Sequence, residues 1–329
     1  MKKNIWMILM TLVLICITLS GCKKNVGTPE DNAIVEDDGE ETERDGYLFG
    51  YSISNLEDPY YQAVKKSLEV ESRKKDAELL VKDAQSDAEL QNQQIQEMID
   101  AKVDAVFLIP VDSEKITEGL ELLEEVNIPV INLDMKVKES TLIDAYVGSD
   151  NKNAGYLCGE DLLIQCPDGG KVLIMENSAL SSMNERITGF ERAIANEGFS
   201  VISRVQMQGD REHAKEKMKE FLTEYAQIDA VMCANDLIAL GVLDAVRDDG
   251  RTDILVYSVG GSPQVKTEIA KGDSLMRGTG AQSPIKVGQN AVDICAAVLD
   301  GEEYKSEIQT DTVFISKENV ELYGTNGWQ

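Results

Sequence analysis

The chain contains a single histidine, which limits the catalytic chemistry that the sequence can support. His213 stands near Asp210 and Glu212 in a segment of helical pattern, where a surface position is expected. A Ser-His-Asp triad would need a histidine held beside a nucleophile, and a histidine metal cluster would need several. The sequence therefore predicts neither a triad of this kind nor a metal site.

The motifs of nucleotide-binding proteins and hydrolases are also absent from the sequence. No G-x-S-x-G, P-loop or G-x-G-x-x-G pattern occurs, and Gly278-Thr279-Gly280 lacks the later glycine of a nucleotide loop. Paired carboxylates can hydrolyse glycosides, but among 59 acidic residues such pairs arise by chance. We therefore expect a protein that is not an enzyme and carries no cofactor.

Polar residues gather instead directly after short apolar runs of strand length. In an open parallel sheet, ligands bind outside the carboxyl ends of the strands. The polar groups in such positions are residues 54–58, Asp134, residues 149–151, residues 235–236, residues 260–262 and Gln282. The pattern indicates a binding cleft, although loops are polar in most proteins.

Two successive series of strand and helix patterns position these residues. The first predicts strands at 47–53, 78–82, 105–109, 130–133 and 145–147, and the second at 171–175, 200–205, 230–233, 255–259 and 275–279, with a closing strand at 310–315. Helices are expected to begin at Asp58-Pro59, at Ser86 with Glu89 as a capping box, and near Ser113, and to cover 183–196, 212–225, 237–247, 263–271 and 284–299. The fold class is α/β, with two doubly wound parallel-sheet lobes.

The amino-terminal segment predicts export and a lipid anchor. Lys2 and Lys3 precede an apolar run over residues 5–19, which is shorter than the ~20 residues of a membrane span. Leu19-Ser20-Gly21-Cys22 resembles a bacterial lipobox, so residues 1–21 are expected to be a signal peptide and Cys22 the lipidated residue. An uncleaved membrane anchor is the alternative.

The next segment, residues 22–46, is predicted to be an acidic tether without apolar period. Its carboxylates lack the spacing and the turn glycine of a calcium loop. The net charge of −27 becomes −29 once residues 1–21 are removed, so nucleic acid and anionic lipid surfaces are excluded as partners.

Four cysteines remain after Cys16 and Cys22 are set aside, namely Cys158, Cys166, Cys233 and Cys295. No two of them form a C-x-x-C pair, which favours free thiols. A disulfide between Cys158 and Cys166 is the alternative in an oxidising compartment.

The motifs at the strand exits resemble the type I periplasmic sugar-binding proteins, and most closely the ribose-binding branch. The resembling motifs are Ser54 with Asp58-Pro59-Tyr60-Tyr61, residues 128–134, residues 148–151 with Gly155, residues 184–186 with Gly189-Phe190, residues 234–236, residues 239–241, Gly261-Ser262-Pro263 and Gln282. The resemblance implies hinge closure of two lobes joined by three crossing strands near 149–150, 281–282 and 311. The lobes would be 47–149 with 282–311, and 150–281 with 312–329.

The resemblance also implies roles for individual residues. Tyr60 and Tyr61 match an aromatic pair that stacks on the sugar ring, since a sugar has an apolar C–H face. The other matching contacts are Asp134, Arg186, Asn235 and Gln282, with Ser54 and Ser149 as smaller polar groups. Both tyrosines could instead be structural, and Asp134 or Arg186 could form a structural ion pair.

Several positions depart from the family pattern. Met135 replaces an arginine, Gly260 replaces an aspartate, Asp58 replaces an asparagine and Gly209 replaces an aromatic residue, so ribose itself is in doubt. A less ionic site would suit a deoxysugar, a modified sugar or a non-sugar ligand. Because Trp328 lies in the tail, the sequence argues against indole stacking in the cleft.

The resemblance implies a monomeric binding component of an ABC importer, outside the cytoplasm and anchored through Cys22 beside a permease. A ligand sensor that docks on a histidine kinase or chemoreceptor ectodomain stays open as the alternative. A repressor of the lactose-repressor type shares this fold, but it would need a basic helix-turn-helix before Tyr47, where this chain has an export signal and an acidic tether.

Overall fold

The computed structural model describes residues 45–207 and 210–329, which fall within one compact unit. The predicted signal peptide, Cys22, most of the tether and Gly209 lie outside the described residues. The described part of the chain has no helix long and apolar enough to cross a membrane.

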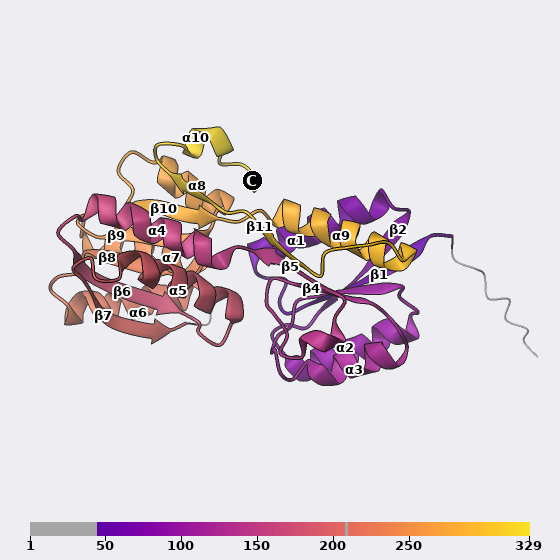
Figure 1. Ribbon diagram of the computed structural model, residues 1–329. Coiled ribbons are helices and arrows are strands. Elements are labelled where there is room, and N and C mark those ends of the chain that lie inside the picture. The colour runs from indigo at the N-terminus through magenta and orange to yellow at the C-terminus, as the bar shows by residue number, and fades with distance from the viewer. Residues whose placement is uncertain (1–44, 208–209) are drawn as a thin grey trace, which may run out of the picture. The chain divides into compact units, whose positions relative to one another are not determined.

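The first sheet has six parallel strands in the order β11-β5-β4-β3-β1-β2. Its strands are β1 (Tyr47–Ile53), β2 (Ala77–Asp83), β3 (Ala105–Leu108), β4 (Val130–Leu133), β5 (Ala145–Ser149) and β11 (Glu307–Thr310). Figure 1 shows α1 (Pro59–Arg73) and α9 (Pro284–Asp300) on one face, and α2 (Ala88–Asp100) and α3 (Thr117–Glu125) on the other. Both faces are covered, which accounts for the buried and mainly apolar central strands β3 and β4.

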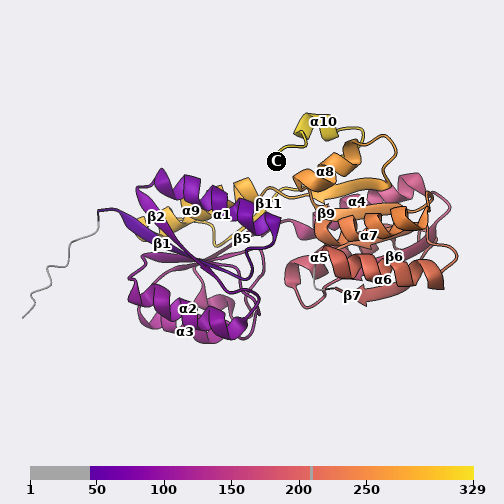
Figure 2. The same ribbon diagram turned by 180° about the vertical axis from the view of Figure 1, so that it is seen from behind.

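The second sheet has the order β12-β10-β9-β8-β6-β7, and only β12 runs antiparallel to its neighbour. Its strands are β6 (Gly170–Glu176), β7 (Phe199–Gln206), β8 (Ala230–Cys233), β9 (Leu255–Gly260), β10 (Met276–Ala281) and β12 (Val313–Ser316). Its helices are α4 (Asn151–Gln165), α5 (Ser181–Ile194), α6 (Arg211–Glu224), α7 (Asp236–Asp249), α8 (Pro263–Ala270) and α10 (Val320–Tyr323). Helix α4 packs on α5, and α6 packs on α7. Figure 2 shows α6 and α7 side by side in front of the second sheet.

The chain passes between the two sheets three times, after β5, after β10 and after β11. The predicted α/β class with two doubly wound sheets is confirmed. The single closing strand expected at 310–315 is wrong, because the chain leaves the first sheet after Thr310 and joins the second at Val313.

Two helix starts also differ from the predictions. Ser86 has a positive φ of 65°, and Asp87 is the N-cap of α2, because its carboxylate accepts from the backbone N–H groups of Glu89 and Leu90. Helix α3 begins at Thr117 rather than near Ser113, after a turn in which the Asp112 carboxylate accepts from backbone N–H groups.

Helix α4 was not predicted, because small residues rather than an apolar stripe form its buried face. Gly155 and Gly159 let α4 approach α5 closely. A Cβ atom on Gly155 would stand 1.7 Å from the main-chain oxygen of Arg186, so only glycine allows this contact. The same contact fixes the part of α5 that carries Arg186.

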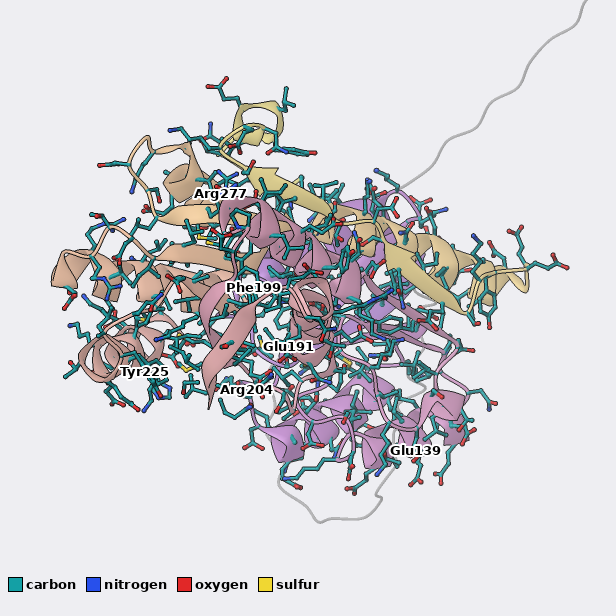
Figure 3. All side chains as sticks on the ribbon, turned by 60° about the vertical axis from the view of Figure 1, so that its left-hand side comes forward. Glu139, Glu191, Phe199, Arg204, Tyr225 and Arg277 are labelled. Atoms are coloured by element: carbon teal, nitrogen blue, oxygen red, sulfur yellow. The ribbon has the colours of Figure 1, made fainter. Side chains whose placement is uncertain are left out.

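Ion pairs reinforce the second sheet and its helices. Arg277 of β10, labelled in Figure 3, forms a two-pronged bond to Asp161 of α4, with N–O distances of 2.8 and 2.9 Å. The Tyr257 hydroxyl donates to the same carboxylate at 2.8 Å. At the other edge, Arg204 of β7 pairs with Glu191 and with the buried Glu176, and Figure 3 shows Arg204 beside Glu191.

The four cysteines of the described chain are free thiols. Cys158, Cys233 and Cys295 are buried, and burial raises the pKa of each thiol. The Cys158 thiol donates to the main-chain oxygen of Ser258 at 3.2 Å. The disulfide left open between Cys158 and Cys166 is therefore absent, and Cys158 and Cys233 pack as small core residues.

Candidate ligand-binding site

A cavity of about 150 Å³ is lined by residues from both sheets and their helices. A cavity of about this size holds a single six-membered ring. Its lining consists of Asp58, Pro59, Tyr60, Tyr61, Asp134, Ser182, Met183, Arg186, Arg211, Asn235, Asp236, Leu237, Leu240, Val259, Gly260, Ser262, Gln264, Gln282 and Trp328. Eight of the predicted site residues thus meet around one cavity.

The start of α1 places the two tyrosines at the cavity. Asp58 is the N-cap, and its carboxylate accepts from the backbone N–H of Tyr60 at 2.8 Å. Pro59 occupies the first helical turn, where its missing N–H costs nothing. The rings of Tyr60 and Tyr61 lie edge to face, with centroids 5.7 Å apart.

Asp134 follows β4 in a left-handed conformation, with φ 55°, which few residues other than glycine, asparagine and aspartate adopt. Its Oδ2 atom accepts from the Tyr61 hydroxyl at 3.1 Å and from the Ser182 hydroxyl at 3.5 Å. Its Oδ1 atom is buried and has no hydrogen-bond partner among the described residues. The Tyr60 hydroxyl is also buried, and the Ser149 side chain is its hydrogen-bonding neighbour.

Arg186 of α5 connects three segments at the cavity. Its Nε donates to Asn151 Oδ1 at 2.8 Å, and its two terminal nitrogens donate to the Ala234 main-chain oxygen at 2.9 Å and to Gln282 Oε1 at 3.0 Å. The side chain is buried, with the whole residue 5% exposed. Because Asn151 and Gln282 follow β5 and β10, the guanidinium bridges two of the passages between the sheets.

The amides beside Arg186 are themselves fixed. Gln282 Nε2 donates to Asn151 Oδ1 at 3.3 Å, and Gln282 N–H donates to the Gly260 oxygen at 2.8 Å. Asn235 is the N-cap of α7, with Oδ1 accepting from Ile238 N–H at 2.9 Å. Buried polar groups held in this way present a rigid hydrogen-bonding surface.

Gly260 adjoins Asp236, which the sequence analysis listed among the polar residues that follow a strand but to which it gave no role. Asp236 Oδ1 accepts from Ser258 Oγ at 2.5 Å and from Thr279 Oγ1 at 3.2 Å, and Oδ2 accepts from Ser262 N–H at 2.6 Å. A Cβ on Gly260 would stand 2.6 Å from this carboxyl group. A side chain at position 260 would therefore collide with Asp236, which brings a carboxyl group to the cavity wall.

Burial dominates the titration of the acidic groups in the cavity. It raises the pKa of Asp58 to about 6, and the Asp134 charge contributes in the same direction, while Arg186 opposes it. Burial also raises the pKa of Asp134, again opposed by Arg186. Perturbed carboxyl groups in a cavity mark candidate functional sites.

Three predicted site residues lie outside the cavity. Ser54 and Met135 line a larger neighbouring hollow of about 670 Å³, which shares Asp58 and Tyr61 with it. The turn after β4 folds back because Asn132 Nδ2 donates to the Met135 oxygen at 2.9 Å. Ser149 is buried at the end of β5, where its hydroxyl accepts from Thr310 Oγ1 at 3.4 Å.

Other lining residues were missed by the sequence analysis. Trp328 contradicts the argument against an indole in the cleft, since it lines the cavity and packs edge to face on Tyr60, with ring centroids 5.6 Å apart. No periodic pattern marks residues 324–329, so nothing local predicted this contact. Asp236 belongs to the motif at residues 234–236 but was assigned no role, and Ser182 stands two residues before the motif at 184–186. Arg211 follows the helix cap Asp210. These positions were the available signal for the three residues.

The sequence matches a family model, described as a periplasmic binding protein domain, over residues 49–303. The chain belongs to the periplasmic binding protein family. The family predicted from the strand-exit motifs is confirmed, and the chain is an extracytoplasmic solute-binding protein rather than an enzyme.

Named relatives of this binding protein agree with that assignment. The ribose import binding protein RbsB of Bacillus subtilis is 29% identical over 263 residues, which cover 80% of this chain and 85% of that protein. An ABC transporter solute-binding protein from Mycobacterium smegmatis, solved with bound glycerol, has a TM-score of 0.82 at 26% identity and covers 86% of this chain and 99% of its own. Another, from Actinobacillus succinogenes with bound D-allose, has a TM-score of 0.79 at 26% identity, covering 84% and 100%.

Proposed function

We propose that this binding protein captures a ring-form monosaccharide in the cavity and delivers it to an ABC importer. One observation carries the proposal. Asp134 Oδ1 is buried without a hydrogen-bond partner among the described residues, and the same carboxyl group is bonded to Tyr61, one of two adjoining aromatic rings. A sugar hydroxyl would satisfy this oxygen, while the C–H face of the ring would pack on the aromatic side chains.

The relatives support a polyhydroxylated ligand. RbsB of Bacillus subtilis is described as a ribose import protein, and the Actinobacillus succinogenes protein was solved with D-allose. Met135 lines the adjoining hollow rather than the cavity itself, and Asp236 brings a carboxyl group beside Gly260. These two departures from the family pattern therefore weigh less against a sugar than the sequence alone suggested.

The proposal includes the parts that act around the cavity. The two lobes would be 47–149 with 282–311, and 150–281 with 312–329, and they would close on the ligand by hinge motion at the three passages. The protein would act as a monomer, held to the membrane by lipid on Cys22. The motif Leu19-Ser20-Gly21-Cys22 after a short apolar run supports the anchor.

The test is thermal unfolding against pentoses, hexoses, inositols and their alditols. A ligand at about 1,000 times its dissociation constant adds ~4 kcal/mol to the free energy of unfolding, which raises the midpoint by several degrees. Arg186→Lys should abolish the shift, because three different guanidinium nitrogens reach Asn151, Ala234 and Gln282, and a single compact ammonium nitrogen cannot reproduce that planar arrangement. Exposed Lys305→Arg is the matched control and should keep the shift.

Two results would overturn the proposal. Cooperative unfolding that no sugar or alditol shifts would remove the sugar as ligand. A shift that survives in Arg186→Lys would move the binding site elsewhere. A ligand that binds but is not taken up by cells that carry the protein would instead favour the sensor alternative.

A further inference from the structure

The segment after α10, residues 324–329, returns to the ligand cavity. Trp328 lines the cavity although it lies beyond the matched family region, which ends at residue 303. Figures 1 and 2 both show the end of the chain, marked C, close to α8. A residue from outside the matched region thus forms part of the wall.

Trp328 extends the aromatic wall that Tyr60 and Tyr61 begin. Its ring meets Tyr60 at an interplanar angle of 75°, and Tyr60 meets Tyr61 at 66°. Tyr60 is only 8% exposed, so it stands between the other two rings as a fixed centre. Three large rings around a cavity of about 150 Å³ leave room for one small ring and favour an apolar ligand face.

Gln329 holds this segment in place. Its side-chain amide donates to the main-chain oxygens of Gln282 and Gly260, at the ends of β10 and β9. Its Oε1 accepts from the ammonium group of Lys266 at 3.2 Å, and its main-chain oxygen accepts from the Ser283 hydroxyl. Every polar atom of the Gln329 side chain is therefore bonded to the framework of the site.

The hydrogen bond between Lys266 and Gln329 involves a buried cation. Lys266 is fully buried, and burial lowers the pKa of its ammonium group. A buried cation needs hydrogen-bond acceptors, and Gln329 Oε1 is the one that the described contacts provide for Lys266 Nζ. Removal of the Gln329 amide would leave the cation poorly satisfied as well as release the indole.

We propose that Trp328 is a specificity-determining wall residue of the ligand cavity, positioned by Gln329. It selects ring-form sugars, which offer a continuous C–H face, over open-chain alditols, in which the ring oxygen has become a further hydroxyl and that face is lost. The inference rests on the proposed function, because it assigns the third aromatic wall of the same site.

The first measurement needs no ligand. Trp6 and Trp328 are the two tryptophans of the chain, so a full-length Trp6→Phe variant reports on Trp328 alone. The emission should be blue-shifted and weakly quenched by acrylamide, and Gln329→Ala should shift it to the red and increase quenching. Emission typical of exposed indole, unchanged by Gln329→Ala, would overturn the placement.

The second measurement compares affinities by calorimetry for the ring sugar that gives the largest thermal shift and for the alditol formed by its reduction. Trp328→Ala should weaken binding of the ring sugar about tenfold or more and bring it close to that of the alditol, while Trp328→Phe keeps most of the preference. Equal or tighter binding by Trp328→Ala overturns the inference, and tighter binding would identify the segment as a plug.

Failure of the proposed function has a different signature. In that case no sugar or alditol shifts the unfolding of the parent protein, and the wall assignment falls with the sugar site. If a sugar shifts the parent and the Trp328→Ala variant alike, the proposed function stands and only the role of Trp328 is refuted.

Discussion

At the scale of single residues, the site keeps polar groups in states that cost stability. Asp134 combines a left-handed backbone, a buried carboxylate and an oxygen without a partner among the described residues. Such strain and unpaired polarity are typical of binding sites, where the ligand supplies what the fold leaves out. Substitutions here should therefore change stability and affinity in opposite directions.

Asp134→Asn is the sharpest case. Asparagine tolerates positive φ, so the backbone should not change. Because burial raises the pKa of Asp134, its charge destabilises the ligand-free protein at pH 7, and the neutral amide should raise the unfolding midpoint. The same change should weaken sugar binding by about 10–100-fold, since a bond between a charged group and a hydroxyl contributes ~1.5–3 kcal/mol.

Calorimetry and thermal unfolding of Asp134→Asn decide this together. Asp293→Asn, on the outer surface of α9 with a side chain 73% exposed, is the control and should alter neither quantity. A lower midpoint together with unchanged affinity would show that Asp134 is a structural residue.

Asp58 predicts a dependence of stability on pH. Its pKa of about 6 in the folded protein exceeds the usual value of an aspartate, so the folded state binds the proton more tightly than the unfolded state. The stabilisation is complete below about pH 4 and is lost as the pH rises through 6. Asp58→Asn keeps the helix cap and should unfold at a higher temperature than the parent at pH 7.5.

The difference between Asp58→Asn and the parent should shrink as the pH falls from 7.5 to 5. Melting curves of both proteins in one buffer series measure it, and the comparison cancels the effect of the other carboxylates. A difference that stays constant with pH would show that Asp58 is ionised throughout this range.

At the scale of elements, the sequence predicted most strands and helices but not their tertiary contacts. Apolar runs located β1, β4 and β8 to the residue, because buried parallel strands must be apolar. Helix α4 was not predicted because its buried face depends on Gly155 and Gly159. These small residues form no apolar pattern, and they matter because they let α5 approach closely. Trp328 was missed because its partner Tyr60 is 268 positions away in the sequence.

One ion pair between α4 and β10, close to the surface, is expected to contribute strongly to the free energy of unfolding. Arg277 and Asp161 have side chains 19% and 11% exposed, and their bond is two-pronged. Arg277→Met should lower the free energy of unfolding by about 2 kcal/mol, because it leaves a largely buried carboxylate with only the Tyr257 hydroxyl.

Arg251→Met provides the matched comparison for Arg277→Met. Arg251 pairs with Asp253, whose side chain is 64% exposed, so its loss should cost less than about 1 kcal/mol. Urea unfolding of the two variants and of Asp161→Asn measures the difference. Equal effects of Arg277→Met and Arg251→Met would show that the Arg277–Asp161 ion pair contributes no more to stability than an exposed ion pair.

At the scale of the whole molecule, the cavity adjoins the passage of the chain after β10, whose residue Gln282 lines it. Arg186 bonds to residues that follow two of the three passages, and Gln329 bonds to the same framework. Ligand binding and the relative position of the two lobes should therefore be coupled, as hinge closure requires. The formal net charge of −27 disfavours binding to anionic lipid surfaces.

That charge makes the proposed lipid on Cys22 the deciding attachment, and Cys22→Ser tests it. The full-length parent should fractionate with membranes and incorporate a labelled fatty acid. The two acyl chains of a diacylglyceryl group on Cys22 would anchor the protein stably, whereas the negative charge of the protein is repelled by anionic lipids. Cys22→Ser should lose the label, and Cys16→Ser is the control that should keep it.

The location of the Cys22→Ser variant shows whether residues 1–21 are cleaved. If they are cleaved, the variant should appear in the soluble extracytoplasmic fraction; if they remain, it should stay with membranes without label. Label retained in Cys22→Ser, or absent from the parent, would contradict the lipid anchor, and an unlabelled parent in membranes would favour the uncleaved apolar segment instead.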